Sequence, residues 1–275
     1  MTLGTKQRTL RSSAVMRGRG LHTGEECRIE IMPAEPDSGL VFVSGGEEIE
    51  AVVANVRDTN RGTTLGRGEI EIHTVEHLLA ALAGMEVDNA VVGIKGPEIP
   101  VADGSALPFV EMIESAGIVE QDADVRPIVL DTPAWVSDGA KCLLAVPSER
   151  YRISAFISFQ HPMIGEQALG VTLSPESFKR EIAPARTFCT SDEIEAILAQ
   201  GLGRGATEDN VVVVKDDGYS VPPRFPDEFV RHKILDLIGD LALAGRRLRA
   251  DVTGIRTSHA LNVALARVVR GRQGG

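Results

Sequence analysis

The sequence predicts an α+β fold of two domains that share a similar plan. Runs of alternating apolar and polar residues precede runs of helical periodicity, and this order occurs twice along the chain. The chain has 275 residues, of which 43% are hydrophobic, and is long enough to bury one large core or two ordinary ones. We therefore expect an N-terminal α+β domain at residues 1–122 and a C-terminal α+β domain at residues 123–275.

In the first domain, short alternating runs predict the strands and longer amphipathic runs predict the helices. The expected elements are strands at residues 28–31, 40–43, 49–53 and 89–94, and helices at about 74–85 and 107–116. Gly84 lies near the end of the first helix and is a stop signal. The polar stretch Glu120–Asp124 follows the second helix and is the predicted linker between the domains.

The second domain repeats this order with one addition. The expected elements are strands at residues 127–130, 142–146, 151–159 and 250–256, and helices at 175–182, 229–244 and 258–269. A small strand–helix–strand insert is expected at about residues 189–217. The glycine-rich turn at 201–205 follows a helix and does not join a strand to one, which excludes a dinucleotide-binding fingerprint. The sequence also lacks a GxxxxGK[ST] phosphate loop.

Composition and charge narrow the cellular setting. The net charge of −10 argues against a nucleic-acid partner, although a few local cations can still hold an anionic small molecule. The three cysteines are far apart and lack CxxC spacing, which predicts a reducing compartment. Residues 1–8 have no apolar core of a signal peptide, and no run approaches the roughly 18 apolar residues of a membrane span. We expect a cytoplasmic monomer without a transmembrane segment.

The helix at 229–244 carries a stripe of ionisable residues. At about 100° per residue, His232, Asp236 and Asp240 fall on one face. A His and an Asp four residues apart on a helix can bind one divalent metal ion. Taken alone, the stripe more often indicates a solvated face with one ion pair.

A second motif makes a metal site the favoured interpretation of this stripe. Thr74 is the expected N-cap of the helix at 74–85, which puts Glu76 and His77 in its first turn. Alone, Glu76 would only complement the helix dipole and His77 would be a structural imidazole. Together with His232 and Asp236, His77 completes two imidazoles and one carboxylate, a common ligand set of catalytic zinc. Glu76 would then be well placed to take a proton from a water molecule, and the spacing differs from HExxH.

His259 is the third element of the pattern. It lies where a strand meets a helix, and a lone His in such a place is more often structural. A hydrolase that releases an amine needs a proton donor, and His is the usual one at neutral pH. Asp240 is a candidate partner of His259, because a nearby carboxylate raises the pKa of an imidazole.

These residues belong to a set of motifs that resembles the motifs of a known protein family. Over almost its whole length the chain resembles the zinc-dependent UDP-3-O-acyl-N-acetylglucosamine deacetylases of lipid A biosynthesis. The motifs that carry the resemblance lie, in order, at residues 7–10, 20–24, 74–78, 96–100, 103–105, 185–188, 227–233 and 259–262.

The resemblance implies two similar sandwiches with helices packed between their sheets, and it implies the roles of individual residues. His77, His232 and Asp236 match the metal ligands, for Zn²⁺ or alternatively Fe²⁺. The implied catalytic residues are the general base Glu76, the general acid His259, its supporting carboxylate Asp240 and the oxyanion-stabilising Thr187. The implied substrate-binding residues are Lys141, Phe159, Phe188, Lys233 and Arg256, with Ile194, Ile197, Val211 and Val213 lining an acyl-chain passage in the insert.

Two positions depart from the family pattern, which usually has glycine at both. Ser258 precedes the acid, where a Ser is unfavourable if the backbone needs a positive φ, and Cys189 follows Phe188. A free Cys beside a site can be reactive, but burial as a small apolar side chain is more common. The alternatives to the enzyme are a non-catalytic nucleotide-sugar or lipid-binding paralogue and a small-molecule kinase. The kinase would need a phosphate loop at a helix N-terminus.

Overall fold

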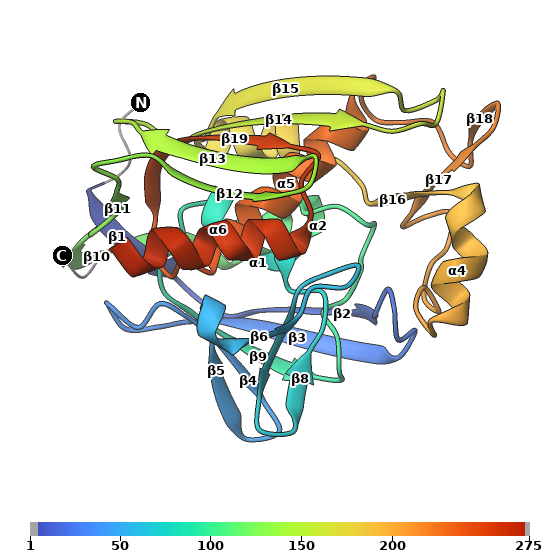
Figure 1. Ribbon diagram of the computed structural model, residues 1–275. Helices are drawn as coiled ribbons and strands as arrows, with labels where there is room; N and C mark the ends of the chain where they lie inside the picture. The colour runs from blue at the N-terminus through green and yellow to red at the C-terminus, as the bar shows by residue number, and fades with distance from the viewer. Residues whose placement is uncertain (1–4, 273–275) are drawn as a thin grey trace.

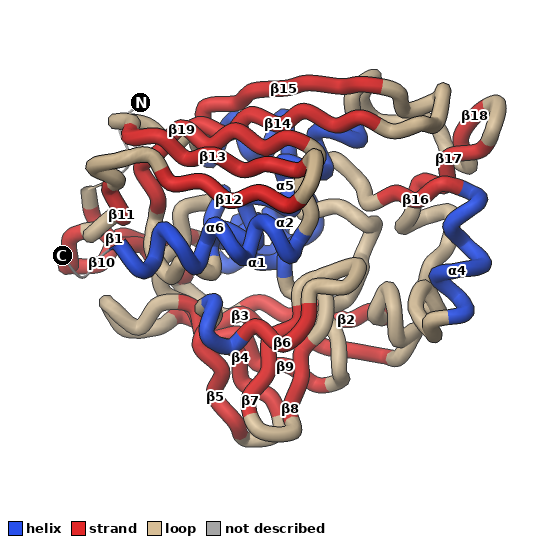
Figure 2. Tube along the Cα trace, in the orientation of Figure 1, coloured by secondary structure: helices blue, strands red, loops and turns tan. Residues whose placement is uncertain are grey.

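Two β-sheets form the outer layers of the protein, and four helices lie between them (Figure 1). The computed structural model describes residues 5–272. The expected α+β fold with helices between the sheets is confirmed, and Figure 2 shows these four helices with strands above and below them. The sequence predicts that residues 1–8 are not a signal peptide, and residues 1–4 of this segment lie outside the described residues. No helix within residues 5–272 is long and apolar enough to cross a membrane.

The first sheet is built from the first half of the chain. Its strand order is β2-β3-β9-β4-β5, with β4 and β9 parallel and the other neighbours antiparallel. Alternation places Cys27, Ile29 and Ile31 of β3 in the core, as the sequence pattern predicts. The strands are β2 (Ala14–Arg19), β3 (Glu26–Pro33), β4 (Leu40–Ser44), β5 (Glu47–Glu50) and β9 (Ala90–Lys95).

The second sheet repeats the topology of the first. Its order is β12-β13-β19-β14-β15, with β14 and β19 parallel and the other neighbours antiparallel, and β11 pairs with β19 as an extra strand. The strands are β11 (Ile128–Val129), β12 (Ala134–Asp138), β13 (Lys141–Pro147), β14 (Arg152–Ser158), β15 (Glu166–Thr172) and β19 (Leu248–Ile255). Each half thus contains four sequential strands, a helix, the central strand and a final helix.

The four helices occupy equivalent places in the two halves. In the first half α1 (Glu76–Gly84) precedes the central strand and α2 (Leu107–Ala116) follows it. In the second half α5 (Glu228–Ala242) and α6 (His259–Gly271) take these places. Apolar residues of both halves join one continuous core. Because α5 packs against α1, α6 and the second sheet, its polar stripe is buried, and the interpretation of that stripe as a solvated face is wrong.

Smaller elements complete the chain. The expected insert is present as β16 and β17, which run parallel, with a short helix between them and β18 in a hairpin (Figure 1, right). The remaining elements are β1 (Lys6–Leu10), η1 (Val53–Asn55), β6 (Val56–Asp58), β7 (Thr64–Arg67), β8 (Ile70–Ile72), β10 (Ile118–Asp124), α3 (Pro175–Ser177), η2 (Phe178–Ile182), β16 (Phe188–Thr190), η3 (Ser191–Glu193), α4 (Ile194–Ala199), β17 (Val212–Lys215) and β18 (Gly218–Tyr219).

Two local predictions are wrong. The segment Glu120–Asp124 is not a linker but part of β10, which pairs antiparallel with β1 from the start of the chain. The expected strand at 49–53 ends at Glu50 and gives way to the helical turn η1. The predicted stop at Gly84 is confirmed, because Gly84 is the last residue of α1. An added Cβ at Gly84 would overlap the ring of Phe178.

A glycine lets the two central helices approach each other. Gly239 of α5 lies against the backbone of Glu76, the first residue of α1, and an added Cβ would overlap the Glu76 carbonyl oxygen. A glycine inside a helix normally costs about 1 kcal/mol relative to Ala. Here it allows the beginning of α1 to reach the middle of α5.

A buried carboxylate fixes the turn that leads into α1. Glu98 is fully buried and accepts hydrogen bonds from the backbone N–H groups of His22 and Thr23 and from the hydroxyls of Thr23 and Thr74. Thr74 has a φ of 59°, which is strained for a β-branched residue. Its hydroxyl donates to Glu98 at 2.7 Å and does not cap α1, whose N-cap residue is Val75, so the predicted N-cap is wrong.

Replacing Gly239 by Ala should destabilise the protein. The expected loss in the free energy of unfolding is about 1–3 kcal/mol, because strain from the new methyl group exceeds the gain in helix propensity. Chemical denaturation measures the change. Gly271→Ala is the matched control, because Gly271 is also helical and an added Cβ there meets nothing within 4 Å. Equal stability of the two variants would contradict the close contact.

Replacing Glu98 by Gln should lower stability in a pH-dependent way. Burial would raise the pKa of Glu98, but its backbone and hydroxyl donors outweigh burial and lower the pKa from 4.5. A carboxylate with a lowered folded-state pKa stabilises the fold above its unfolded pKa, and this contribution is lost as the pH falls.

We therefore expect Glu98→Gln to cost about 1–3 kcal/mol at pH 7, with the difference from the unaltered protein shrinking below pH 4.5. Denaturation at several pH values checks this, with the exposed Glu69→Gln as control. A difference independent of pH would show that the charge of Glu98 does not matter.

Candidate metal centre and active-site cavity

One cavity of about 980 Å³ opens at the place where α1 meets α5. The predicted site residues line this cavity, except Asp240, which contacts the cavity residue His259. The predicted residues that line it are Glu76, His77, Lys141, Phe159, Thr187, Phe188, Ile194, Ile197, Val211, Val213, His232, Lys233, Asp236, Arg256 and His259. The volume is typical of a site for a drug-sized or larger small molecule.

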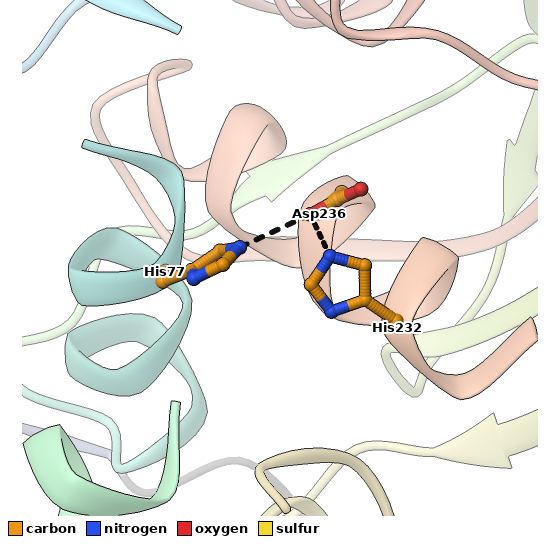
Figure 3. Close-up of side chains that lie close together, drawn as sticks. All are labelled: His77, His232 and Asp236. Carbon is orange, nitrogen blue, oxygen red and sulfur yellow. Dashed lines mark ion pairs between the residues drawn. The ribbon is translucent and has the colours of Figure 1, made fainter. Parts of the chain in front are cut away.

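Three side chains converge at the base of this cavity (Figure 3). His77 comes from the first turn of α1, and His232 and Asp236 come from successive turns of α5. One ligand atom of each lies within 4.8 Å of the others. Asp236 Oδ1 is 3.7 Å from His77 Nε2 and 3.4 Å from His232 Nε2.

The donor atoms of this triad suit a divalent cation. Asp236 Oδ1 is buried and has no hydrogen-bond partner, whereas Oδ2 accepts a hydrogen bond from Lys233 Nζ at 2.6 Å. His232 Nδ1 lies 3.1 Å from the Ala185 carbonyl oxygen, so Nδ1 donates and Nε2 offers its lone pair to the centre. Two imidazole nitrogens and one carboxylate oxygen therefore face one point.

The electrostatics keep these ligands in the forms that bind metal. Burial lowers the pKa of His232 to about 3, so the imidazole is neutral at physiological pH. Burial alone would raise the pKa of Asp236, but the neighbouring His232 and Lys233 hold it well below its usual range. Metal ligands must be deprotonated, and both groups meet this condition.

Glu76 lies beside the triad and is almost fully buried. Its Oε2 accepts a hydrogen bond from the backbone N–H of Thr63 at 2.9 Å. Burial raises the pKa of Glu76, against the opposing effect of the imidazoles of His259 and His77. A carboxylate with a raised pKa is a suitable general base near neutral pH.

The predicted pairing of His259 with Asp240 is confirmed. His259 Nδ1 donates to Asp240 Oδ2 at 2.8 Å, and Asn262 Nδ2 donates to the same oxygen at 2.9 Å. Burial would lower the pKa of His259, but the charge and hydrogen bond of Asp240 outweigh burial and raise it to about 9. His259 is therefore charged at neutral pH, with Nε2 left to act in the cavity.

Thr187 and Phe188 are held at the cavity wall by a buried ion pair. Arg186 donates from its backbone N–H and its Nε to Glu228 Oε1 at 2.9 Å, and Glu228 is fully buried at the start of α5. The Thr187 N–H donates to Gly104 O at 2.8 Å. The ring of Phe188 packs against Phe229, with 4.6 Å between centroids. The wall beside the triad is therefore tied to α5.

Cations and apolar side chains occupy different parts of the cavity. Lys141 begins β13 and Arg256 follows β19, and these strands are antiparallel neighbours with Cys142 opposite Ile255. The two residues therefore lie at the same end of neighbouring strands, and both line the cavity. The insert supplies an apolar wall formed by Ile194, Ile197, Leu198, Val211 and Val213. Leu21, from the first half of the chain, packs against Val211 and also lines the cavity.

The structure accommodates the side chains at both positions that depart from the family pattern. Ser258 has a φ of −145°, which is extended backbone open to any residue, so no strain arises there. Cys189 packs against the cluster of Leu21, Val101 and Val211. Burial, followed by the charge of Glu193, raises the pKa of its thiol, which favours a small apolar side chain over a thiolate.

Three residues that contact the site carry no assignment from sequence. Asn262 lies one helical turn after His259, a spacing that signals a shared face. Glu98 shows no such signal, because its partners are distant in sequence. Thr63 shows none either, because the hydrogen bond between its hydroxyl and Asp240 joins residues 177 positions apart.

Comparison with known sequences agrees with the arrangement of the site. Residues 7–270 match the family described as LpxC, UDP-3-O-acyl N-acetylglycosamine deacetylase. A protein of Anaeromyxobacter named UDP-3-O-acyl-N-acetylglucosamine deacetylase is 43% identical over 96% of this chain and 88% of its own length. Proteins of the same name from Myxococcus xanthus, at 44% over 96% and 86%, and Saccharophagus degradans, at 42% over 94% and 88%, are similar. The chain therefore belongs to the LpxC family of UDP-3-O-acyl-N-acetylglucosamine deacetylases.

Proposed function

We propose that this protein hydrolyses the acetamide of a UDP-3-O-acyl-N-acetylglucosamine, releasing acetate in lipid A biosynthesis. One observation carries the proposal: a buried His77–His232–Asp236 triad, with an unpartnered carboxylate oxygen, faces the same cavity as Glu76 and His259. Membership of the LpxC family supports the substrate.

His77, His232 and Asp236 would hold the metal ion. Zn²⁺ is the ion we propose, with Fe²⁺ as the alternative, because two imidazoles and one carboxylate suit both. Such an ion, when bound, lowers the pKa of water and polarises the amide carbonyl. Lys233 holds Asp236 Oδ2 and so keeps Oδ1 directed at the two imidazoles.

The remaining residues move protons and position charge. Glu76 takes the proton of the attacking water, whose oxygen forms a bond to the acetyl carbon. The Thr187 hydroxyl donates a hydrogen bond to the carbonyl oxygen as it gains negative charge. His259 gives its Nε2 proton to the amide nitrogen as the C–N bond breaks, which leaves acetate and a free amine.

The cavity supports the two ends of the proposed substrate. Lys141 and Arg256, which line the cavity at the same end of β13 and β19, supply positive charge for a diphosphate. Phe159 and Phe188 form an aromatic wall near the triad, with 5.7 Å between their ring centroids, and suit the sugar. The apolar wall of the insert suits a fatty acyl chain.

We also propose that the enzyme acts as a monomer in the cytoplasm. A single chain supplies all of the proposed ligands, base and acid. Its three cysteines are free thiols, which suits a reducing compartment.

An acetate-release assay tests the activity. The purified protein should deacetylate the acylated substrate, lose activity with a chelator and regain it with Zn²⁺. UDP-N-acetylglucosamine without the acyl chain is the control and should turn over more slowly, because it does not use the apolar wall. A protein that binds the nucleotide sugar and releases no acetate is instead the non-catalytic paralogue.

The triad predicts one divalent ion per chain. His77→Ala, His232→Ala and Asp236→Ala should each lose this ion, as measured by elemental analysis of the purified variants, because each removes one of three ligands. His22→Ala is the control, since His22 lines the same cavity outside the triad. Full metal content in the triad variants would exclude the site.

Loss of the proposed acid should separate turnover from metal binding. His259→Ala should lower kcat by about 10²–10⁴-fold, the range for one general acid, while the bound ion remains. Steady-state kinetics and elemental analysis of the same sample check this. Unchanged turnover would remove His259 from the mechanism.

A further inference from the structure

We propose that Thr63 is a positioning residue that holds the general base and the acid-supporting carboxylate in one fixed arrangement. The inference rests on the proposed roles of Glu76, Asp240 and His259. Thr63 lies in the loop between β6 and β7 and is fully buried. It does not line the cavity and touches neither the substrate space nor the metal triad.

Thr63 connects two carboxylates that come from different halves of the chain. Its backbone N–H donates to Glu76 Oε2 at 2.9 Å, and its hydroxyl donates to Asp240 Oδ1 at 2.6 Å. Its carbonyl oxygen accepts a hydrogen bond from the Val75 N–H at 3.1 Å, which ties the loop to the beginning of α1. One residue therefore spans the junction of α1 and α5.

The hydrogen bonds of Asp240 show what the hydroxyl contributes. Oδ2 accepts from His259 Nδ1 and Asn262 Nδ2, and Oδ1 accepts from Thr63. Asp240 is fully buried, so no solvent replaces a donor that is lost. Without the hydroxyl, the buried Oδ1 loses this donor and only the two bonds to Oδ2 orient the carboxylate toward His259.

The short distance indicates a strong bond. A hydroxyl that donates to a carboxylate oxygen forms a charge-assisted hydrogen bond, typically at 2.5–2.7 Å. The loop lies close to Glu76 at Gly62 as well, because a Cβ added there would lie 3.1 Å from Glu76 Oε1. Thr63 therefore links a loop that packs against Glu76 to the carboxylate of Asp240.

Thr64, the next residue and the first of β7, supplies a matched control. It is also a buried threonine with a bonded hydroxyl, but its Oγ1 lies 3.0 Å from His73 Nδ1 and contacts no carboxylate. Thr63→Val and Thr64→Val each remove one buried hydroxyl and keep the side-chain shape. Only the first should affect the reaction.

The experiment measures kcat, KM and bound metal for the metal-loaded variants. Thr63→Val should lower kcat by about 10–100-fold, the factor for one hydrogen bond to a charged group, with KM and metal content unchanged. Thr63→Ser keeps the hydroxyl and should restore kcat to within about threefold of the unaltered enzyme. Thr64→Val should match the unaltered enzyme. In an Asp240→Asn background, Thr63→Val should cost much less.

Several results would overturn the proposal. These are an unchanged kcat for Thr63→Val, an equal loss in Thr64→Val, no rescue by Ser, or an undiminished effect in the Asp240→Asn background. If Thr63→Val does not fold, Thr63→Ala, which adds no bulk, takes its place. His259→Ala and Glu76→Gln run in parallel. Retained turnover in those two would refute the proposed roles themselves, whereas their collapse beside an unaffected Thr63→Val refutes only the role of Thr63.

Discussion

The close approach of α1 to α5 is the constraint on which the rest of this structure depends. Gly239 lets the backbone of α5 meet the carbonyl oxygen of Glu76, so the first turn of one helix lies against the middle of the other. His77 thereby reaches His232 and Asp236, although neither helix alone carries the complete triad. The central helices of the two halves occupy equivalent positions in a repeated topology, and their junction is the site.

A buried polar network surrounds this junction. Burying a charge is unfavourable unless hydrogen bonds or opposite charges compensate it. Asp240 has donors on both oxygens, and Asp236 Oδ2 has Lys233. Within residues 5–272, Asp236 Oδ1 and Asn262 Oδ1 are buried without a hydrogen-bond partner. Asp236 Oδ1 is the one that lies between two imidazole nitrogens, an arrangement that suits a cation.

The two halves share a plan, and their differences supply the function. The first half adds the loop before β7, which brings Thr63 to Glu76 and Asp240, and the turn that Glu98 fixes before α1. The second half adds the insert, whose apolar residues form one wall of the cavity (Figure 1). The repeated sheets thus provide a rigid frame, while the additions to each half shape the chemistry and the substrate space.

The sequence by itself determined the local structure and the chemical character of the site. Periodicity predicted the helix at 107–116 with its observed bounds, and the four-residue spacing of His232 and Asp236 placed both on one face of α5. Only the tertiary structure decided that this stripe is buried, that β10 pairs with β1, that Thr74 adopts a positive φ and that Thr63 reaches Asp240. The reason is physical: side-chain periodicity reports contacts within a turn or a strand, whereas contacts between residues far apart in the chain depend on how complete layers pack.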